Sequence, residues 1–231
     1  MVLPVKNKSF FPAEFQDKTR LAYYSHLFNS VEINASFYKM PLARTVAKWS
    51  SEVPGGFRFS FKLVKDVTHL QKQTFKLNPV RDFIDRISAT PKRGCLLIQL
   101  PPKFAPDIVQ LELLLLETKD CGWDVAIEFR HPGWYNDDIL QILNNNDVAM
   151  VIHDMPKSRA PMELTSDRFV YIRFHGPESG YRGSYTDSFL HEYSEYIKEW
   201  IHDGKTVYCY FNNTLGAAVR NLQTLNQFVA K

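Results

Sequence analysis

The sequence predicts an α/β fold in which parallel strands alternate with helices. Three observations predict it: seven short segments rich in β-branched or aromatic residues, a mean spacing of about 29 residues between their starts, and helical patterns in most of the gaps. That spacing is typical of a strand followed by a helix that returns the chain to the start of the next parallel strand. The predicted strands are Ser30–Ser36, Phe57–Leu63, Gly94–Leu100, Asp124–Arg130, Val148–Asp154, Phe169–His175 and Thr206–Asn212.

Helices are predicted where apolar residues recur at helical spacing, over Ala13–Phe28, Pro106–Glu117, Asp187–Ile201 and Thr214–Val229. The gap between Asp154 and Phe169 contains two prolines and leaves little room for a helix. The chain has no linker, low-complexity stretch or charge block. We therefore expect residues 1–231 to form a single domain.

Composition excludes several classes of protein. With 45% hydrophobic residues, the chain has the apolar surface that an intrinsically disordered protein lacks. Its net charge, 28 − 25 = +3, is too small to indicate a nucleic-acid or membrane partner by itself. No apolar run approaches the ~18 residues of a membrane span, and the N-terminus lacks a signal-peptide core. Cys95, Cys121 and Cys209 cannot all pair, which predicts a reduced, cytoplasmic protein.

The barrel form of this fold is favoured over a doubly wound sheet. A doubly wound sheet usually has a glycine-rich turn after its first strand, and neither GxGxxG nor GxxxxGK[ST] occurs here. A closed barrel needs no such motif, because its site is built where the strands end. The prediction is therefore a TIM-type (β/α) barrel with seven clear parallel strands.

Polar side chains near the C-terminal end of every predicted strand indicate a site there. Burying unpaired charges costs several kcal/mol per ion, so these groups must pair with one another or serve a ligand. The pairs Glu128–Arg130 and Asp154–Arg173 could simply close the mouth as salt bridges, but polarity recurring at one end of the strands favours a ligand. The side chains concerned are Glu32, Asn34, Lys62, Gln99, Glu128, Arg130, His131, Asp154, Arg173, His175 and Asn212.

Aromatic residues in the adjoining loops fit the same interpretation. Tyr38, Trp134, Tyr181 and Tyr185 lie in loops that also carry Arg and Lys. Such aromatic faces suit a polar ring, a sugar or a base, which they bind by stacking and by cation–π contact. Ordinary loop packing is the alternative, above all for Trp134.

Six motifs, in order, resemble the YecE-like proteins, also called the DUF72 family. They are VEINASFYKMP, the TH at Thr68–His69, LIQLPPKF, EFRHPGW, RFHG and YFNN, and the resemblance covers roughly residues 10 to 225. It implies a TIM-type barrel, no settled activity, and a place for His69 among the site residues named above. Members usually begin with a strand of the GTSGW kind. Here only Val2–Val5 could replace it, so we expect the first canonical strand to be missing or rudimentary, along with any site residue from its loop.

The favoured function is acid–base chemistry on a small polar or phosphorylated, sugar-like ligand, although the sequence does not decide whether the protein is an enzyme. Lys62, Arg130 and Arg173 would hold an anionic group, Glu128 or Glu32 would act as base, and His175 as acid or shuttle. Lys62 could alternatively form a Schiff base, and glycoside hydrolysis is a special case. The catalytic candidates are Glu32, Lys62, Glu128, Asp154 and His175; the ligand-binding candidates are Asn34, Tyr38, His69, Gln99, Arg130, His131, Trp134, Arg173, Tyr181, Tyr185 and Asn212.

Two alternatives remain open. A metal-dependent hydrolase or isomerase would use Glu, Asp and His at the mouth, but no HxH or HExxH spacing occurs and the three cations there would repel a metal ion. We therefore expect no metal or cofactor. A non-enzymatic module for nucleic acid or a nucleotide would use basic and aromatic loop residues, yet these are dispersed. The expected partner is a small polar or anionic ligand, with no membrane, and the oligomeric state is not indicated.

Overall fold

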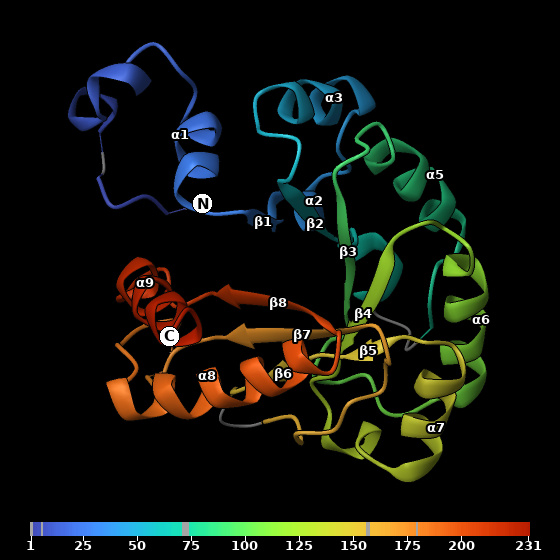
Figure 1. Ribbon diagram of the computed structural model, residues 1–231. Coiled ribbons are helices and arrows are strands. Elements are labelled where there is room, and N and C mark those ends of the chain that lie inside the picture. The colour runs from blue at the N-terminus through green and yellow to red at the C-terminus, as the bar shows by residue number, and fades with distance from the viewer. Residues whose placement is uncertain (1, 6, 71–73, 156–157, 179) are drawn as a thin grey trace. The chain divides into compact units, whose positions relative to one another are not determined.

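The computed structural model describes residues 2–5, 7–70, 74–155, 158–178 and 180–231. Two compact units make up the chain (Figure 1). Unit 1 contains Leu3–Pro101 and Asp107–Val125, and unit 2 contains Pro102–Pro106 and Ala126–Lys231. Each unit is built from parallel strands and the helices that connect them.

The strands of unit 1 are β1 (Ser30–Ile33), β2 (Arg58–Lys62) and β3 (Arg93–Gln99). β1 pairs in parallel with β2, and β2 with β3. Glu32 lies opposite Ser60 in this register, and Lys62 lies opposite Leu97. Because side chains alternate along a strand, Glu32, Lys62 and Gln99 share one face near the C-terminal ends of their strands.

Helices surround these strands and bury their apolar sides against them. The amphipathic helix α5 buries Val80, Phe83, Ile84 and Ile87. The α-helices of unit 1 are α1 (Arg20–Leu27), α2 (Ala35–Tyr38), α3 (Ala43–Ser51), α4 (Lys65–Thr68), α5 (Asn78–Ile87) and α6 (Ile108–Thr118), and two 3₁₀ turns, Lys8–Phe10 and Ala13–Phe15, precede them.

The N-terminal part of unit 1 differs from the sequence prediction. The predicted helix over residues 13–28 is wrong in its first turns: a 3₁₀ turn ends at Phe15, and α1 begins only at Arg20. Thr19 caps α1, since its hydroxyl accepts a hydrogen bond from the backbone N–H of Ala22 at 3.1 Å. Among the described residues no strand precedes β1, and Leu3 packs with Phe11 and Tyr23.

The strands of unit 2 form two parallel sets. β4 (Asp124–Glu128), whose last three residues belong to unit 2, pairs with β5 (Ala149–Met150). β6 (Ile152–His153), β7 (Phe169–Phe174) and β8 (Thr206–Phe211) pair in that order. Every pairing between the described strands is parallel, which confirms a parallel α/β fold.

Helices α7 (Asp137–Asn145), α8 (Asp187–His202) and α9 (Ala218–Val229) complete unit 2 with the 3₁₀ turn Pro132–Trp134. α8 and α9 lie beside β7 and β8 in Figure 1. Their apolar residues form one cluster with those of β7, which includes Ile172, Phe174, Leu190, Tyr193 and Leu225. The predicted helices Pro106–Glu117, Asp187–Ile201 and Thr214–Val229 correspond to α6, α8 and α9.

Two predicted strands have other bounds in the structure. The first ends at Ile33 and α2 follows at once, with the single hydroxyl proton of Ser36 within hydrogen-bonding distance of the carbonyls of Ile33 and Lys62 (2.6 and 2.7 Å). The fifth is divided into β5 and β6 at Val151, whose N–H donates to the carbonyl of Ile127 at 2.9 Å. The described residues between Asp154 and Phe169 contain no helix, as predicted.

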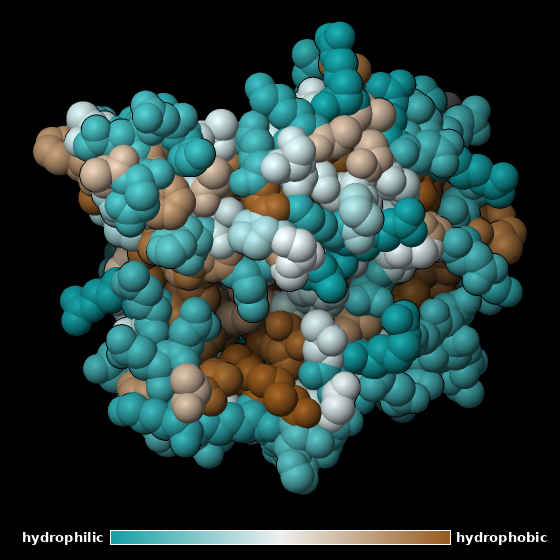
Figure 2. Space-filling view, turned by 45° about the horizontal axis from the view of Figure 1, so that its top comes forward, coloured by the Kyte–Doolittle hydropathy of each residue, from teal (hydrophilic) through white to brown (hydrophobic). Residues whose placement is uncertain are grey.

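The surface drawn in Figure 2 is mostly hydrophilic, with smaller groups of hydrophobic residues. None of the helices that the structure describes has the length and hydrophobicity to cross a bilayer.

Candidate functional site

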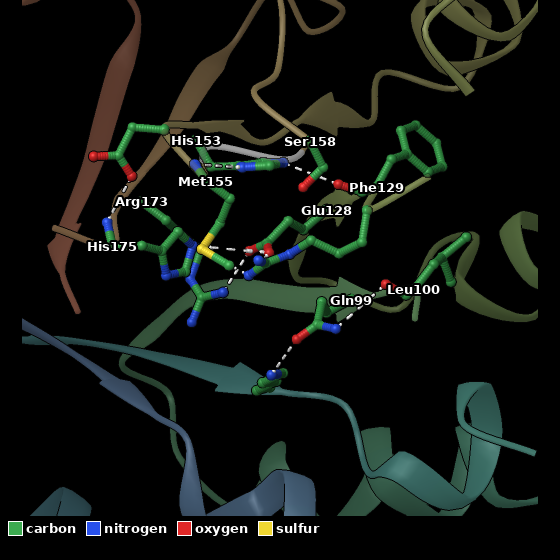
Figure 3. A network of polar contacts seen from close by, with 12 residues as sticks. Gln99, Leu100, Glu128, Phe129, His153, Met155, Ser158, Arg173 and His175 are labelled. Atoms are coloured by element: carbon green, nitrogen blue, oxygen red, sulfur yellow. Dashed lines mark hydrogen bonds and ion pairs between the residues drawn. The ribbon is translucent and has the colours of Figure 1, made fainter. Parts of the chain in front are cut away.

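A buried charged cluster in unit 2 centres on Glu128, the last residue of β4 (Figure 3). Glu128 has no exposed surface. One of its carboxylate oxygens, Oε1, forms an ion pair with Arg130, and the other, Oε2, accepts a hydrogen bond from Nη1 of Arg173. With His175, whose Nε2 lies 3.8 Å from Oε1, these residues form the Glu128 cluster.

The positions of these residues follow from the strands. Glu128 and Arg130 are two residues apart at the end of β4, and Arg173 and His175 are two residues apart at the end of β7, so each pair points the same way. The three partners of Glu128 are between 2% and 8% exposed. The site thus lies at the C-terminal ends of parallel strands, where ligands bind in α/β proteins.

The cluster carries one excess positive charge. Burial by itself raises the pKa of Glu128, but the guanidinium groups of Arg173 and Arg130 outweigh it and hold this pKa well below its ordinary value. Glu128 is therefore ionised at neutral pH. One carboxylate against two guanidinium groups leaves a net charge of +1 in a buried place.

His175 is neutral, and its tautomer is fixed by Arg130. Nη2 of Arg130 lies 3.2 Å from Nε2 of His175. Arginine can only donate, so Nε2 accepts and the ring proton lies on Nδ1. Burial lowers the pKa of His175 to about 2, and the charges of Arg173 and Arg130 act in the same direction while Glu128 opposes them. His175 is thus a hydrogen-bond donor through Nδ1.

Two buried donors of the cluster have no acceptor among the described residues. They are Nε of Arg130 and Nδ1 of His175. A buried donor left unpaired costs about 1–3 kcal/mol, so native proteins supply a partner from the chain, from water or from a ligand. These two atoms mark where the described residues supply no acceptor.

His153 lies beside the cluster and is held there by hydrogen bonds to neighbouring groups. Its Nε2 lies 2.9 Å from the carbonyl oxygen of Phe129 and 3.1 Å from the Tyr135 hydroxyl, which also contacts the carbonyl of Ser158 at 3.0 Å. Burial lowers the pKa of His153, so it too is neutral. Tyr135 was not among the predicted site residues, and no signal other than its loop position could have identified it.

The loop after β7 is locked against the turn after β8. Gly176 has φ = +107°, and a methyl group there would overlap the carbonyl oxygen of Arg182. A methyl group on Gly216 would likewise overlap Gly183. Backbone bonds from Leu215 to Tyr181 (3.2 Å) and from Ala217 to Gly183 (3.1 Å) join the two segments. Tyr181 is thereby held with its ring 5.7 Å from that of His175.

Trp134 lies in the core of unit 2. It is completely buried and stacks on Phe129 with ring centroids 4.8 Å apart. Its indole N–H donates to the carbonyl of Phe104 at 2.8 Å. The Trp134 side chain therefore belongs to the core, in agreement with the loop-packing alternative given for it in the sequence analysis.

Replacing Trp134 by phenylalanine is expected to lower the free energy of unfolding by about 1–3 kcal/mol, because the buried hydrogen bond from the indole N–H to the Phe104 carbonyl is lost. Urea denaturation followed by circular dichroism measures this change. Trp200 to phenylalanine on α8, which also trims a buried indole, is the size control. A loss equal to that of the control would mean that the hydrogen bond to Phe104 contributes nothing.

A second polar cluster, the Lys62 cluster, belongs to unit 1 and contains Phe37, Lys62, His69 and Gln99. The ammonium group of Lys62 donates to Oε1 of Gln99 at 2.6 Å and lies 4.1 Å from the centroid of the Phe37 ring. Nε2 of Gln99 lies 3.4 Å from Nε2 of His69. The amide can only donate there, so the His69 proton lies on Nδ1, 2.8 Å from Oγ1 of Thr68. Burial, with Lys62 and Lys65, lowers the pKa of His69 to about 4.

Other predicted residues of unit 1 lie near this cluster. Nδ2 of Asn34 donates to Oε1 of Glu32 at 2.9 Å, and Glu32 shares its sheet face with Lys62. Tyr38 is 72% exposed and contacts Phe37 edge-on.

The remaining predicted residues belong to unit 2. His131 caps its own turn by accepting from the N–H of Gly133 at 3.1 Å, and the N–H of Asn212 extends the β7–β8 ladder to Phe174. Asp154 and Tyr185 contact each other and the backbone at His175. No group of three or more His, Cys, Asp or Glu that could hold a metal ion occurs in the part of the chain that the structure describes.

Similar proteins match almost the whole chain. A family model described as "Protein of unknown function DUF72" matches residues 4–231. The UPF0759 protein YunF of Bacillus subtilis (strain 168) is 26% identical over 241 aligned positions, which cover 90% of this chain and 85% of YunF.

Solved structures share the fold. A DUF72 family protein from Enterococcus faecalis V583 has a TM-score of 0.81 at 22% identity, over 92% of this chain and 89% of that one. Another from Thermotoga maritima MSB8 has a TM-score of 0.77 at 24% identity, over 91% and 89%. The order of motifs, the parallel α/β fold and the match over residues 4–231 lead to one conclusion: the chain belongs to the DUF72 family of proteins of unknown function.

Proposed function

We propose that the Glu128 cluster binds the anionic group, a phosphate or a carboxylate, of a small polar ligand. One observation carries the proposal: a buried cluster with one excess positive charge presents two donors, Arg130 Nε and His175 Nδ1, that no described protein group accepts. An oxyanion would place a negative charge beside the two guanidinium groups and would accept from both donors.

The energetics favour an anion over a neutral ligand. Beside Arg130 and Arg173 an anion meets two guanidinium groups and one carboxylate in a buried place, where charge attraction is stronger than in water. Hydrogen bonds between charged partners are about twice as strong as neutral ones, and the planar guanidinium group suits the oxygens of phosphate and carboxylate. A cation would meet two guanidinium groups and no free carboxylate oxygen in this cluster.

The acid–base reaction predicted from the sequence remains part of the proposal, with changed roles. Glu128 has a pKa well below its usual value and is paired through both oxygens, which makes it a poor base. His175, with a pKa of about 2, carries no second proton to give near neutral pH. Both residues are proposed to recognise the ligand, and proton transfer needs another group.

Arg130 to lysine is the test of this recognition. Lysine keeps the positive charge beside Glu128 but lacks the Nε–H donor. Titration calorimetry with inorganic phosphate and with glycerol phosphate is expected to show binding to the wild type and about tenfold weaker binding to the variant, since one lost hydrogen bond to a charged group is worth ~1.4 kcal/mol or more.

Arg168 to lysine is the matched control, because Arg168 makes an exposed ion pair with Asp147 in the same unit. This control is expected to bind as the wild type does. Failure of the wild type to bind phosphate, glycerol phosphate or acetate would contradict the proposal, as would equal affinities for the two arginine variants. Preference for a single-stranded oligonucleotide, with affinity falling steeply as salt rises, would instead favour the nucleic-acid alternative.

We also propose that the chain forms one TIM-type barrel in a single domain, in a reducing, cytoplasmic compartment. Support for the barrel comes from the consecutive parallel pairings and from the polar residues that recur at C-terminal strand ends. Support for the compartment comes from the free cysteines Cys95, Cys121 and Cys209. A crystal structure of the chain tests the closure of the strands.

A further inference from the structure

We infer that Asp154 and Tyr185 form a positioning pair that fixes His175 in the conformation in which its ring contacts Arg130. This inference rests on the proposed function, because the pair would fix the position from which Nδ1 of His175 donates to the ligand. It assigns Asp154, a catalytic candidate in the sequence, a role that acts through His175.

The pair binds two consecutive backbone N–H groups where β7 ends. Oδ1 of Asp154 accepts from the N–H of His175 at 2.7 Å. The N–H of Gly176 donates to the hydroxyl oxygen of Tyr185 at 2.5 Å, and that hydroxyl donates to Oδ2 of Asp154. β7 pairs with β8 up to Phe174. The next two backbone N–H groups, those of His175 and Gly176, donate to side-chain oxygens instead.

The direction of each hydrogen bond is determined. A backbone N–H can only donate, so the Tyr185 oxygen accepts from Gly176 and its own proton must go to Asp154. Burial, followed by the hydrogen bond to Asp154, raises the pKa of Tyr185 far above the physiological range, so the hydroxyl keeps its proton. Both oxygens of Asp154 are engaged as acceptors, which suits a carboxylate that holds the backbone rather than one that moves protons.

The need for such a pair follows from the sharp turn after His175. Gly176 adopts φ = +107°, so the chain leaves the strand direction at once. The imidazole is then bounded by Arg130 at 3.2 Å and by the Tyr181 ring at 5.7 Å. Fixing the N–H groups of His175 and Gly176 fixes the backbone from which this imidazole projects, and hence the position of Nδ1.

Tyr185 to phenylalanine tests the pair, because it removes only the hydroxyl. Two measurements are made: backbone hydrogen exchange in the ligand-free protein, and affinity for inorganic phosphate. Exchange at Gly176 and His175 is expected to become at least about tenfold faster, with little change in α8, and phosphate affinity to fall about three- to tenfold. Asp154 to asparagine keeps an acceptor for the His175 N–H and is expected to give an intermediate result.

Tyr196 to phenylalanine is the matched control, since its hydroxyl donates to a carboxylate oxygen of Glu192 at 3.2 Å on the exposed side of α8. It is expected to alter neither measurement. Faster exchange spread evenly over unit 2, or unchanged exchange at residues 175 and 176, would overturn the inference. So would local loosening with unchanged phosphate affinity. If the wild type binds no phosphate, the proposed function fails, while the exchange measurement still decides whether the pair holds the backbone.

Discussion

Replacing Arg173 by methionine is expected to lower the free energy of unfolding by about 3–5 kcal/mol. Glu128 is completely buried and pairs through Oε2 with Arg173 and through Oε1 with Arg130. Removing the Arg173 guanidinium group takes away the charge and the hydrogen bond that Oε2 of the buried carboxylate receives. Urea denaturation of the wild type and the variant measures the loss.

Two further variants show whether the loss comes from the buried carboxylate. Arg168 to methionine removes an exposed ion pair with Asp147, and it is expected to cost less than about 1 kcal/mol. Glu128 to glutamine by itself leaves the buried guanidinium groups of Arg130 and Arg173 without that carboxylate, and it is expected to cost at least as much as Arg173 to methionine. A loss below about 1 kcal/mol for Arg173 to methionine alone would contradict the pairing described for Glu128.

Mild acidification is expected to destabilise the protein through His175. The pKa of His175 is about 2 in the folded chain and 6.5 in its ordinary state, so below about pH 6.5 the unfolded chain binds a proton that the folded chain does not. Stability from this group is therefore present above pH 6.5 and falls by about 1.4 kcal/mol per pH unit below it. Between about pH 7.5 and about pH 5 the loss amounts to about 2 kcal/mol.

His175 to glutamine isolates this contribution. Glutamine offers an oxygen to Arg130 but does not titrate, so the variant is expected to lose about 2 kcal/mol less stability than the wild type over the same pH range. His202 to glutamine, at an exposed position of α8, is the control and is expected to keep the wild-type slope. His153, whose pKa burial also lowers, adds loss in the same direction in all three proteins. Equal slopes for the wild type and His175 to glutamine would mean that His175 is not held neutral.

The strands were predictable because their signal is local and strong. β3, β7 and β8 coincide closely with the apolar runs Gly94–Leu100, Phe169–His175 and Thr206–Asn212. The errors fall where one polar side chain competes with the strand. The hydroxyl of Ser36 binds the carbonyl of Lys62, 26 residues away, and no pattern around Ser36 could reveal that partner.

The sequence could indicate which polar residues share a strand face, but not how they interact. Alternation along β4 and β7 indicated that Glu128, Arg130, Arg173 and His175 point the same way, and the Glu128–Arg130 ion pair was among the possibilities. Whether a histidine is a proton carrier or a neutral donor depends on its burial and on the atom that faces each ring nitrogen. Those are tertiary facts, so the sequence could not show that His175 accepts from Arg130.

The locked loops of unit 2 have a consequence for ligand recognition. Because a methyl group at Gly216 would overlap the backbone of Gly183 in the loop after β7, the two segments touch there without a side chain between them. Neither can shift unless the backbone bonds from Leu215 and Ala217 break at the same time. The wall beside His175 is therefore preorganised: a ligand that binds there meets a surface already ordered, and little conformational entropy is lost in shaping it.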